Sequence, residues 1–170
     1  MRPVFLARCA LFSALMCICA WISIPIGNMT FTLQSFALIL ALFVLEGKGA
    51  TVSVAVYLLL GMIGLPVFSG FRGGFGALLG VTGGYLWGFL PACLVFWGIT
   101  AIFGEKAKIY AGIAAMASVY ICGTIWFSVY VSGGLLAIIT QSVLPYLLPD
   151  AIKFLLAFSL SGKLKKLLPA

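Results

Sequence analysis

The chain of 170 residues is 64% hydrophobic and 8% charged, and its mean hydropathy is +1.27. A soluble domain carries about a quarter of its residues as charged side chains, and a disordered segment is poor in aromatic residues, whereas 14% of this chain is aromatic. Both classes are therefore excluded. Six spans of ~20 apolar residues would take up ~120 positions, so the composition predicts one all-α transmembrane domain, residues 1–170, with about six helices.

Six membrane-spanning helices are expected, separated by charged turns or by glycine and proline. The first is an uncleaved helix that stops at Pro25 and Gly27, because these residues end helices, and a polar loop at 27–30 follows it. The predicted ranges, in chain order, are 4–24, 32–45, 50–64, 80–103, 109–131 and 150–166.

Basic residues are distributed unevenly between the two sides of such a bundle. The net charge of +7 comes from ten basic and three acidic residues. For six crossings, eight basic residues fall on the side that holds both chain ends and the turns 46–49 and 104–108: Arg2, Arg8, Lys48, Lys106, Lys108, Lys163, Lys165 and Lys166. Cytoplasmic segments carry this excess, which predicts a multi-pass plasma-membrane protein with cytoplasmic termini. Since the charges flank apolar runs, the expected partner is the lipid bilayer and not nucleic acid.

The cysteines and the lack of histidine argue against metal or acid–base chemistry. The five cysteines are odd in number and lie in apolar stretches, which is typical of small buried residues. Histidine, the commonest metal ligand and general base, does not occur in the sequence. No metal, cofactor or catalytic residue is therefore expected.

Two stretches between the predicted helices are irregular. Residues 65–76 contain Pro66 and four glycines but also apolar side chains, so this loop is expected to fold back over the protein. Residues 135–149 are interrupted by two prolines. In the fourth helix, glycine recurs at positions 80, 84 and 88, which predicts a face that approaches another helix closely.

Asp150 and Lys153 are charges within an apolar span and share one helix face at a spacing of three residues. Ionisable groups at membrane depth cost several kcal/mol unless they are paired or face a polar cavity. One interpretation is a mutual ion pair, with Asp150 also favoured at a helix N-terminus. The other is a ligand cavity in which Lys153 holds an anion and Asp150 accepts hydrogen bonds from N–H donors.

Further candidates lie at the predicted outer ends of the helices. Arg72 is interpreted either as a residue at the lipid headgroups or as a lid residue over the cavity. In the Thr82-Gly83-Gly84-Tyr85 string, Gly83 and Gly84 allow a ligand to approach the backbone and Tyr85 can stack and hydrogen-bond; helix packing and an interfacial aromatic are the alternatives. Gln34 is a further candidate, because a buried glutamine is rare in a membrane.

The first helix carries a stripe of small residues at Ala7, Ala10, Ala14 and Cys17. Small side chains let two membrane helices pack closely. The stripe is interpreted either as internal packing or as a docking face for a separate membrane protein.

Several strings together resemble one transporter family. They are Ala10–Ala14, Thr32-Leu33-Gln34, the GLPVFSG run at 64–70, the TGGYLxGF run at 82–89 and Pro149-Asp150-x-x-Lys153. Over nearly the whole chain they resemble BioY, the biotin-specific substrate-capture (S) component of energy-coupling-factor (ECF) vitamin transporters. Position 81 is Val where the family commonly has Pro.

The resemblance implies a bacterial six-helix bundle whose outer loops close over one biotin, with Phe68 of the GLPVFSG run among the binding residues. It also implies a transmembrane scaffold subunit that docks on Ala7, Ala10 and Ala14, and two cytoplasmic ATPase subunits. The chain contains no Gly-x-x-x-x-Gly-Lys-Ser/Thr string, so ATP hydrolysis is assigned to the partners.

Two other functions compete with biotin capture. One is capture of a different vitamin, such as thiamin or riboflavin, on the same architecture. The other is an intramembrane enzyme with Ser69 or Thr82 as nucleophile and Lys153 as base, although no Gly-x-Ser-x-Gly motif surrounds these residues.

Overall fold

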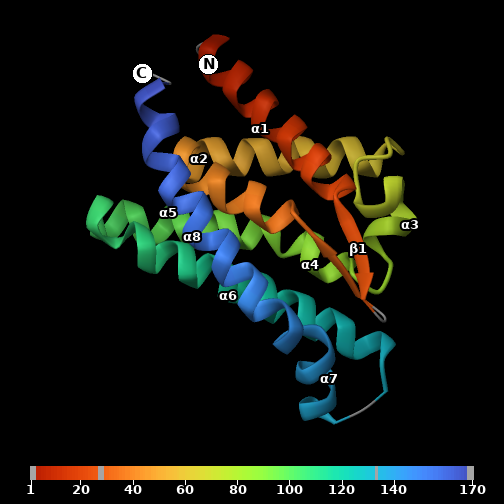
Figure 1. Ribbon diagram of the computed structural model, residues 1–170. Helices are drawn as coiled ribbons and strands as arrows, with labels where there is room; N and C mark the ends of the chain where they lie inside the picture. The colour runs from red at the N-terminus through yellow and green to blue at the C-terminus, as the bar shows by residue number, and fades with distance from the viewer. Residues whose placement is uncertain (1–2, 27–28, 133, 168–170) are drawn as a thin grey trace.

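The computed structural model describes residues 3–26, 29–132 and 134–167 and is helical apart from one short hairpin (Figure 1). In chain order the elements are α1 (Pro3–Trp21), β1 (Ser23–Ile26), β2 (Met29–Thr32), α2 (Gln34–Met62), η1 (Ser69–Phe71), α3 (Phe75–Leu78), α4 (Gly83–Trp87), α5 (Phe89–Phe103), η2 (Glu105–Ala107), α6 (Lys108–Tyr130), α7 (Leu135–Ser142) and α8 (Leu144–Leu167). Within these ranges, five segments are long and apolar enough to cross a membrane: Pro3–Trp21, Gln34–Met62, Gly83–Phe103, Glu105–Tyr130 and Leu144–Leu167.

The second of these segments, α2, consists of two arms that fold back on each other. Its backbone leaves the helical region at Glu46, with φ 63° and ψ −174°. Gln34 donates a side-chain hydrogen bond to the Tyr57 hydroxyl, although 23 residues of straight helix would span ~34 Å. The arms 34–45 and 47–62 therefore lie side by side, as the orange and yellow parts of α2 do in Figure 1. They correspond to the second and third predicted helices.

The core lies where α2 packs against α1, α5 and α8. Phe43 on the first arm of α2 makes edge-to-face contacts with Phe96, Phe154 and Phe158, at ring-centroid distances of 5.8, 5.4 and 5.4 Å. Such aromatic pairs add to the free energy gained by burying apolar area. They join α5 and α8 to the first arm of α2.

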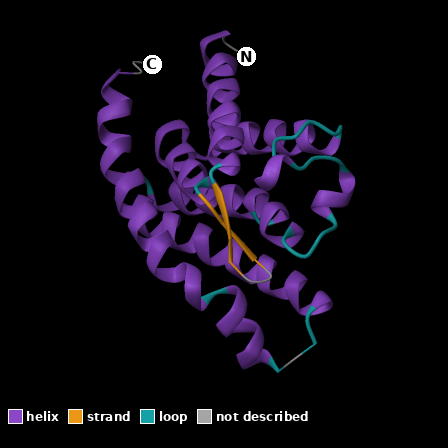
Figure 2. Cartoon of the chain, turned by 45° about the vertical axis from the view of Figure 1, so that its right-hand side comes forward, coloured by secondary structure: helices purple, strands orange, loops and turns teal. Residues whose placement is uncertain are grey.

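A two-stranded hairpin follows α1, where the sequence predicted more helix and then a loop. Helix α1 ends at Trp21, and β1 pairs antiparallel with β2 in a register that places Ser23 opposite Thr32 and Pro25 opposite Thr30. The prediction of helix up to Ile24 was wrong, because the apolar residues before Pro25 suit a strand as well as a helix. Figure 2 shows the strands against the bundle; Gly27 and Asn28 of the predicted loop lie outside the described residues.

The segment after α2 folds back over the second arm of α2, as predicted. The Gly74 N–H donates to the Gly61 carbonyl at 2.7 Å. Phe68 is 2% exposed and lies edge-on to Tyr57 at 5.5 Å between ring centroids. The Phe68 ring occupies the space that a side chain at Gly61 would need. Trp21 ties the end of α1 to the same segment through a 2.7 Å bond from its indole nitrogen to the Pro66 carbonyl.

Glycines bring α4 and the start of α5 close to α6. A Cβ at Gly84 would lie 2.1 Å from the Trp126 Cβ, and a Cβ at Gly88 would lie 3.1 Å from the Val119 Cα. The predicted close-packing face is therefore confirmed at these two positions. At Gly80 a Cβ would meet only carbonyls of its own segment, at 3.4 Å or more, although the Gly80 carbonyl accepts a hydrogen bond from the Trp126 indole of α6 at 2.9 Å. The single helix expected over 80–103 is divided at Gly88 into α4 and α5.

Helix α8 begins at Leu144, six residues earlier than predicted, and contains Pro149. A proline removes one backbone hydrogen bond from a helix interior, which is why the sequence pointed to a helix boundary there. Asp150 accordingly lies within α8, and the expected stabilisation by a helix N-terminus does not apply to it. A short helix, α7, occupies most of the stretch expected to be irregular. It ends at Ser142, and the helical backbone is interrupted at Val143, with φ −120° and ψ −55°.

The turn of α2, the start of α6 and the end of α8 meet at one end of the bundle. The Glu46 carboxylate accepts from Lys108 at 3.0 Å and from Lys165 at 2.9 Å, and Lys108 also pairs with Glu105. In Figure 1 the start of α1 lies toward the same end, whereas the hairpin lies toward the other. The tertiary structure thus groups the turns that the charge distribution assigned to one side.

Candidate ligand-binding site

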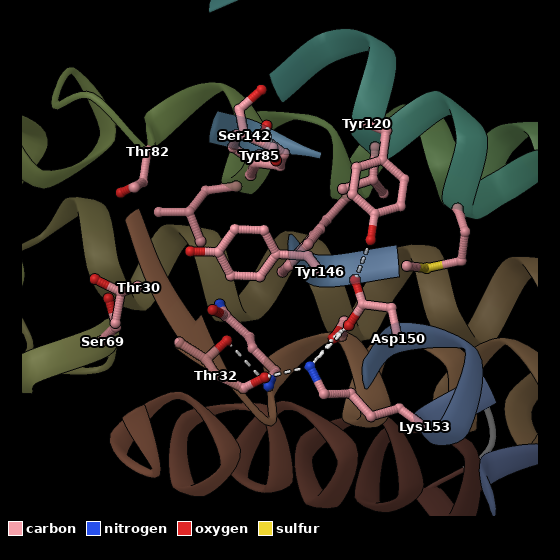
Figure 3. A pocket seen from close by; sticks show the side chains of 16 residues that line it. Thr30, Thr32, Ser69, Thr82, Tyr85, Tyr120, Ser142, Tyr146, Asp150 and Lys153 are labelled. Atoms are coloured by element: carbon pink, nitrogen blue, oxygen red, sulfur yellow. Dashed lines mark hydrogen bonds and ion pairs between the residues drawn. The ribbon is translucent and has the colours of Figure 1, made fainter. Parts of the chain in front are cut away.

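A cavity lies between the hairpin, the start of α2, the helices α4 and α6, and the junction of α7 with α8. It encloses about 720 Å³ of empty space, its open mouth included. The lining residues, ten of which are labelled in Figure 3, are Thr30, Thr32, Gln34, Ser35, Ser69, Thr82, Tyr85, Leu86, Phe89, Met116, Val119, Tyr120, Ser142, Tyr146, Asp150 and Lys153.

Lys153 is buried at the cavity wall, and each of its three N–H groups has an acceptor. Its Nζ lies 2.7 Å from Asp150 Oδ1, 2.7 Å from the Thr32 carbonyl and 3.0 Å from Ser35 Oγ. The ammonium also lies 4.0 Å from the centre of the Phe31 ring, an attractive cation–π contact. Lys153 therefore joins α8 to the hairpin and to the start of α2.

Asp150 accepts hydrogen bonds on both oxygens. Ser35 Oγ donates to Oδ1 at 2.8 Å, beside the Lys153 contact, and the Tyr120 hydroxyl donates to Oδ2 at 2.5 Å. A carboxylate has about four lone-pair sites, so three of the sites are used by these partners and one on Oδ2 is left over. The mutual ion pair that the sequence suggested is formed, and both of its members also line the cavity.

Gln34 connects the cavity to the folded-back segment. It is 5% exposed, and its amide donates to the Tyr57 hydroxyl, which in turn donates to the Val67 carbonyl at 3.2 Å. The predicted candidate Phe68 lies next to this chain of bonds but packs on Tyr57 instead of lining the cavity. Gln34 thus lies in the wall, and Phe68 supports that wall from behind.

The Thr82–Tyr85 string contributes two side chains to the cavity. Thr82 and Tyr85 line it, and the Tyr85 hydroxyl donates to the Ser142 carbonyl at 2.9 Å. A Cβ at Gly83 would meet the Leu78 carbonyl, and one at Gly84 would meet Trp126. The structure therefore fits the packing interpretation of the two glycines.

Arg72 does not line the cavity but is bonded to a residue that does. It is exposed, and its guanidinium donates to the Ser69 carbonyl at 3.1 Å and to Ser69 Oγ at 3.4 Å. Ser69 itself lines the cavity. Arg72 is consequently one residue removed from the wall, on the segment that covers the second arm of α2.

The small-residue stripe of α1 faces outward. Ala7, Ala10 and Ala14 are exposed, whereas Phe12 and Met16 are buried against the core. The three alanines are therefore not used for packing within the chain. Cys17 is buried and so does not belong to this outward face.

The family model of the BioY family matches residues 2–170. The chain belongs to the BioY family. It is 38% identical over 167 residues to the biotin transporter BioY of Thermotoga maritima, covering 95% of this chain and 96% of that protein. It is 35% identical over 156 residues to the probable biotin transporter BioY of Pyrococcus horikoshii, covering 92% and 93%.

A solved structure shares the fold of this BioY-family chain. It is the crystal structure of the S-component for biotin from an ECF-type ABC transporter, with a TM-score of 0.84 and 27% sequence identity, covering 95% of this chain and 90% of that one. The family resemblance and the helical membrane architecture expected from the sequence are therefore confirmed.

The predicted binding residues did not include seven polar residues that line the cavity: Thr30, Thr32, Ser35, Ser69, Tyr120, Ser142 and Tyr146. Tyr146 precedes Asp150 and Lys153 at spacings of four and three residues, which place these three side chains on one face of α8. This signal was hidden because α8 was expected to begin only at Asp150. Tyr120 had no local signal, since its contact with Asp150 joins positions 30 residues apart.

Proposed function

We propose that this protein is the biotin-capturing S component of an ECF transporter, a transport component and not an enzyme. The observation that carries the proposal is the Asp150 carboxylate, which is held by Lys153, Ser35 and Tyr120 at the cavity wall and keeps one acceptor site. The family and its biotin-transporting relatives support it.

The cavity is lined partly by polar and partly by apolar side chains, and biotin has groups that suit both. The ureido group offers N–H donors, and the free lone pair on Asp150 Oδ2 can accept one of them. Leu86, Phe89, Met116 and Val119 supply an apolar surface for the thioether ring and the alkyl chain. Burial of such apolar groups contributes ~25 cal/mol of favourable free energy per Å² of surface removed from water.

Lys153 serves this site by holding Asp150. The sequence suggested that Lys153 binds the ligand's anionic group, but in this structure its three N–H groups are directed at Asp150, Thr32 and Ser35. Binding a carboxylate there would require one of these bonds to be given up. We therefore place the biotin carboxylate in a part of the cavity away from Lys153.

The chain crosses the membrane six times in this proposal, with the α2 arms as two separate crossings. The arms of 12 and 16 residues, 34–45 and 47–62, span ~18 and ~24 Å, which is shorter than the hydrocarbon core and suits a locally thinned bilayer. The basic excess at the Glu46 end of the bundle puts that end and both termini in the cytoplasm, in a bacterial plasma membrane. The partners are a transmembrane scaffold and two ATPase subunits.

Equilibrium binding of labelled biotin tests the proposal. We expect one saturable site with nanomolar dissociation constant, or about −12 kcal/mol, competed by unlabelled biotin and not by thiamin or riboflavin. The control is the same protein after thermal unfolding. Folded protein that shows no saturable binding in detergent and in lipid contradicts biotin capture, and competition by another vitamin would reassign the ligand.

A further inference from the structure

Two hydroxyl groups of the cavity have no hydrogen-bond partner. Among the described residues, Ser142 Oγ and the Tyr146 hydroxyl are the buried side-chain polar atoms that lack one. Ser142 is 0% and Tyr146 is 8% exposed, and both line the cavity. Buried polar groups in native proteins are nearly always hydrogen-bonded, and an unpaired one costs free energy. Two such groups in one cavity indicate that a bound ligand supplies the missing hydrogen-bond partners.

The surrounding structure holds both residues in place without using their hydroxyls. The Ser142 carbonyl accepts from the Tyr85 hydroxyl at the end of α7. The Tyr146 ring packs with Phe127 and Ile138 in a small apolar cluster. Packing therefore holds the Tyr146 ring and a hydrogen bond holds the Ser142 backbone, while the two side-chain hydroxyls are left without a protein partner.

The two ends of the cavity differ in how well their polar groups are satisfied. At one end, Asp150 and Lys153 are hydrogen-bonded to the protein. Figure 3 shows the Tyr146 ring reaching from α8 across the cavity, with its hydroxyl on the side of Thr30 and Thr82 and away from the Asp150 carboxylate. The Tyr146 hydroxyl thus lies away from the ion pair, and Ser142, labelled beside Tyr85 in Figure 3, also lies away from Asp150.

We propose that the hydroxyls of Ser142 and Tyr146 donate hydrogen bonds to the carboxylate of the captured biotin and select ligands by that acidic end. This inference rests on the proposed function, which places the ureido group at Asp150. A carboxylate accepts up to about four hydrogen bonds, and bonds to a charged acceptor are roughly twice as strong as neutral ones. Neutral donors also bind the anion without a second buried cation beside Lys153.

The test uses Ser142→Ala, Tyr146→Phe and the double variant, which remove only the hydroxyls. Tyr130→Phe on α6 is the matched control, because the Tyr130 hydroxyl already donates to the Leu79 carbonyl outside the cavity. Affinity is measured for biotin and for biotinol, in which a neutral hydroxyl replaces the carboxylate. Thermal unfolding is measured without ligand.

Each single variant should weaken biotin binding about ten- to a hundredfold, and its biotinol affinity should change less than about threefold. The ligand-free melting temperature of Ser142→Ala and Tyr146→Phe should stay the same or rise, since no protein hydrogen bond is lost. The control should bind both ligands as the wild type does.

Wild-type affinity for biotin in both single variants would overturn this inference and leave biotin capture intact. Equal losses for biotin and biotinol would also overturn it, because the hydroxyls would then meet another part of the ligand. A wild-type protein that binds neither ligand would overturn the proposed function together with this inference.

Discussion

The Asp150–Lys153 pair is nearly enclosed, with side chains 14% and 7% exposed. Removal of one member of a buried ion pair leaves an uncompensated charge and typically costs ~3–5 kcal/mol, whereas replacement of both members can cost far less. Because Ser35 and Tyr120 also hold the Asp150 carboxylate, the loss of Lys153 is only partly compensated. The pair therefore contributes to folding as well as to the ligand site.

We expect Asp150→Asn to weaken biotin binding by ~1.5–3 kcal/mol, about ten- to a hundredfold, because the acceptor for the ureido N–H loses its charge. Lys153→Ala should weaken binding too, through misplacement of Asp150. Titration with labelled biotin measures both effects. The control is Lys163→Ala, an exposed lysine outside the cavity. Unchanged affinity in Asp150→Asn would mean that the ion pair is only structural.

The stability of the same variants separates folding from binding. Each single change should lower the free energy of unfolding, and the double variant Asp150→Asn/Lys153→Ala should cost less than the sum of the two singles, since the partners are coupled. Thermal unfolding of ligand-free protein gives these values. Strictly additive costs would contradict a coupled pair.

At the scale of an element, α2 turns back at a residue in an unfavourable conformation. Glu46, with φ 63° and ψ −174°, lies in a backbone region that is essentially restricted to glycine and costs about 1–3 kcal/mol for other residues. Its carboxylate accepts hydrogen bonds from Lys108 of α6 and Lys165 of α8. The ion pairs give a reason for a glutamate at a position where the backbone alone would favour glycine.

Glu46→Gly and Glu46→Gln separate these two contributions. Glu46→Gln keeps the strain and loses the charge, so its melting temperature should fall. Glu46→Gly loses the same pairs but relieves the strain, and because exposed ion pairs contribute only ~0–1 kcal/mol each, it should lie within about 1 kcal/mol of wild type. The measurement is thermal unfolding at low and high salt, where screening should narrow the gap between wild type and Glu46→Gln. A glycine variant less stable than the glutamine variant would refute backbone strain at Glu46.

At the scale of the whole molecule, the outward stripe Ala7, Ala10 and Ala14 is the face we assign to the scaffold subunit. Lipid provides no hydrophobic driving force between helices, so association depends on close packing at small residues. The cavity is lined by other elements than α1. Docking and biotin capture therefore use separate surfaces and can be disrupted separately.

Ala10→Trp and Ala14→Trp should reduce co-purification with the scaffold and ATP-driven biotin uptake, while biotin binding by the isolated protein stays unchanged. A tryptophan would hold the two helices apart and forfeit many dispersion contacts. The matched control is Ala117→Trp, at an exposed alanine on α6. Full assembly and uptake by Ala14→Trp would show that the scaffold docks elsewhere.

Much of the architecture was predictable because it depends on local sequence patterns. Apolar runs and charged turns gave the membrane class and the approximate helices, and the spacing of Asp150 and Lys153 gave their shared helix face. The hairpin was missed because a few apolar residues before Pro25 suit both helix and strand. The start of α8 was missed because Pro149 is tolerated inside this helix.

The sequence by itself determined that this protein lies in a membrane, which family it resembles and which buried charges need partners, since composition, motifs and residue spacing are properties of the chain alone. Only the tertiary structure decided which groups meet across the bundle. Tyr120 and Ser35 reach Asp150 from 30 and 115 residues away, and the Ser142 and Tyr146 hydroxyls are left without partners in the same cavity. Such contacts depend on how α2, α6 and α8 pack, and no local pattern in a single sequence specifies that packing.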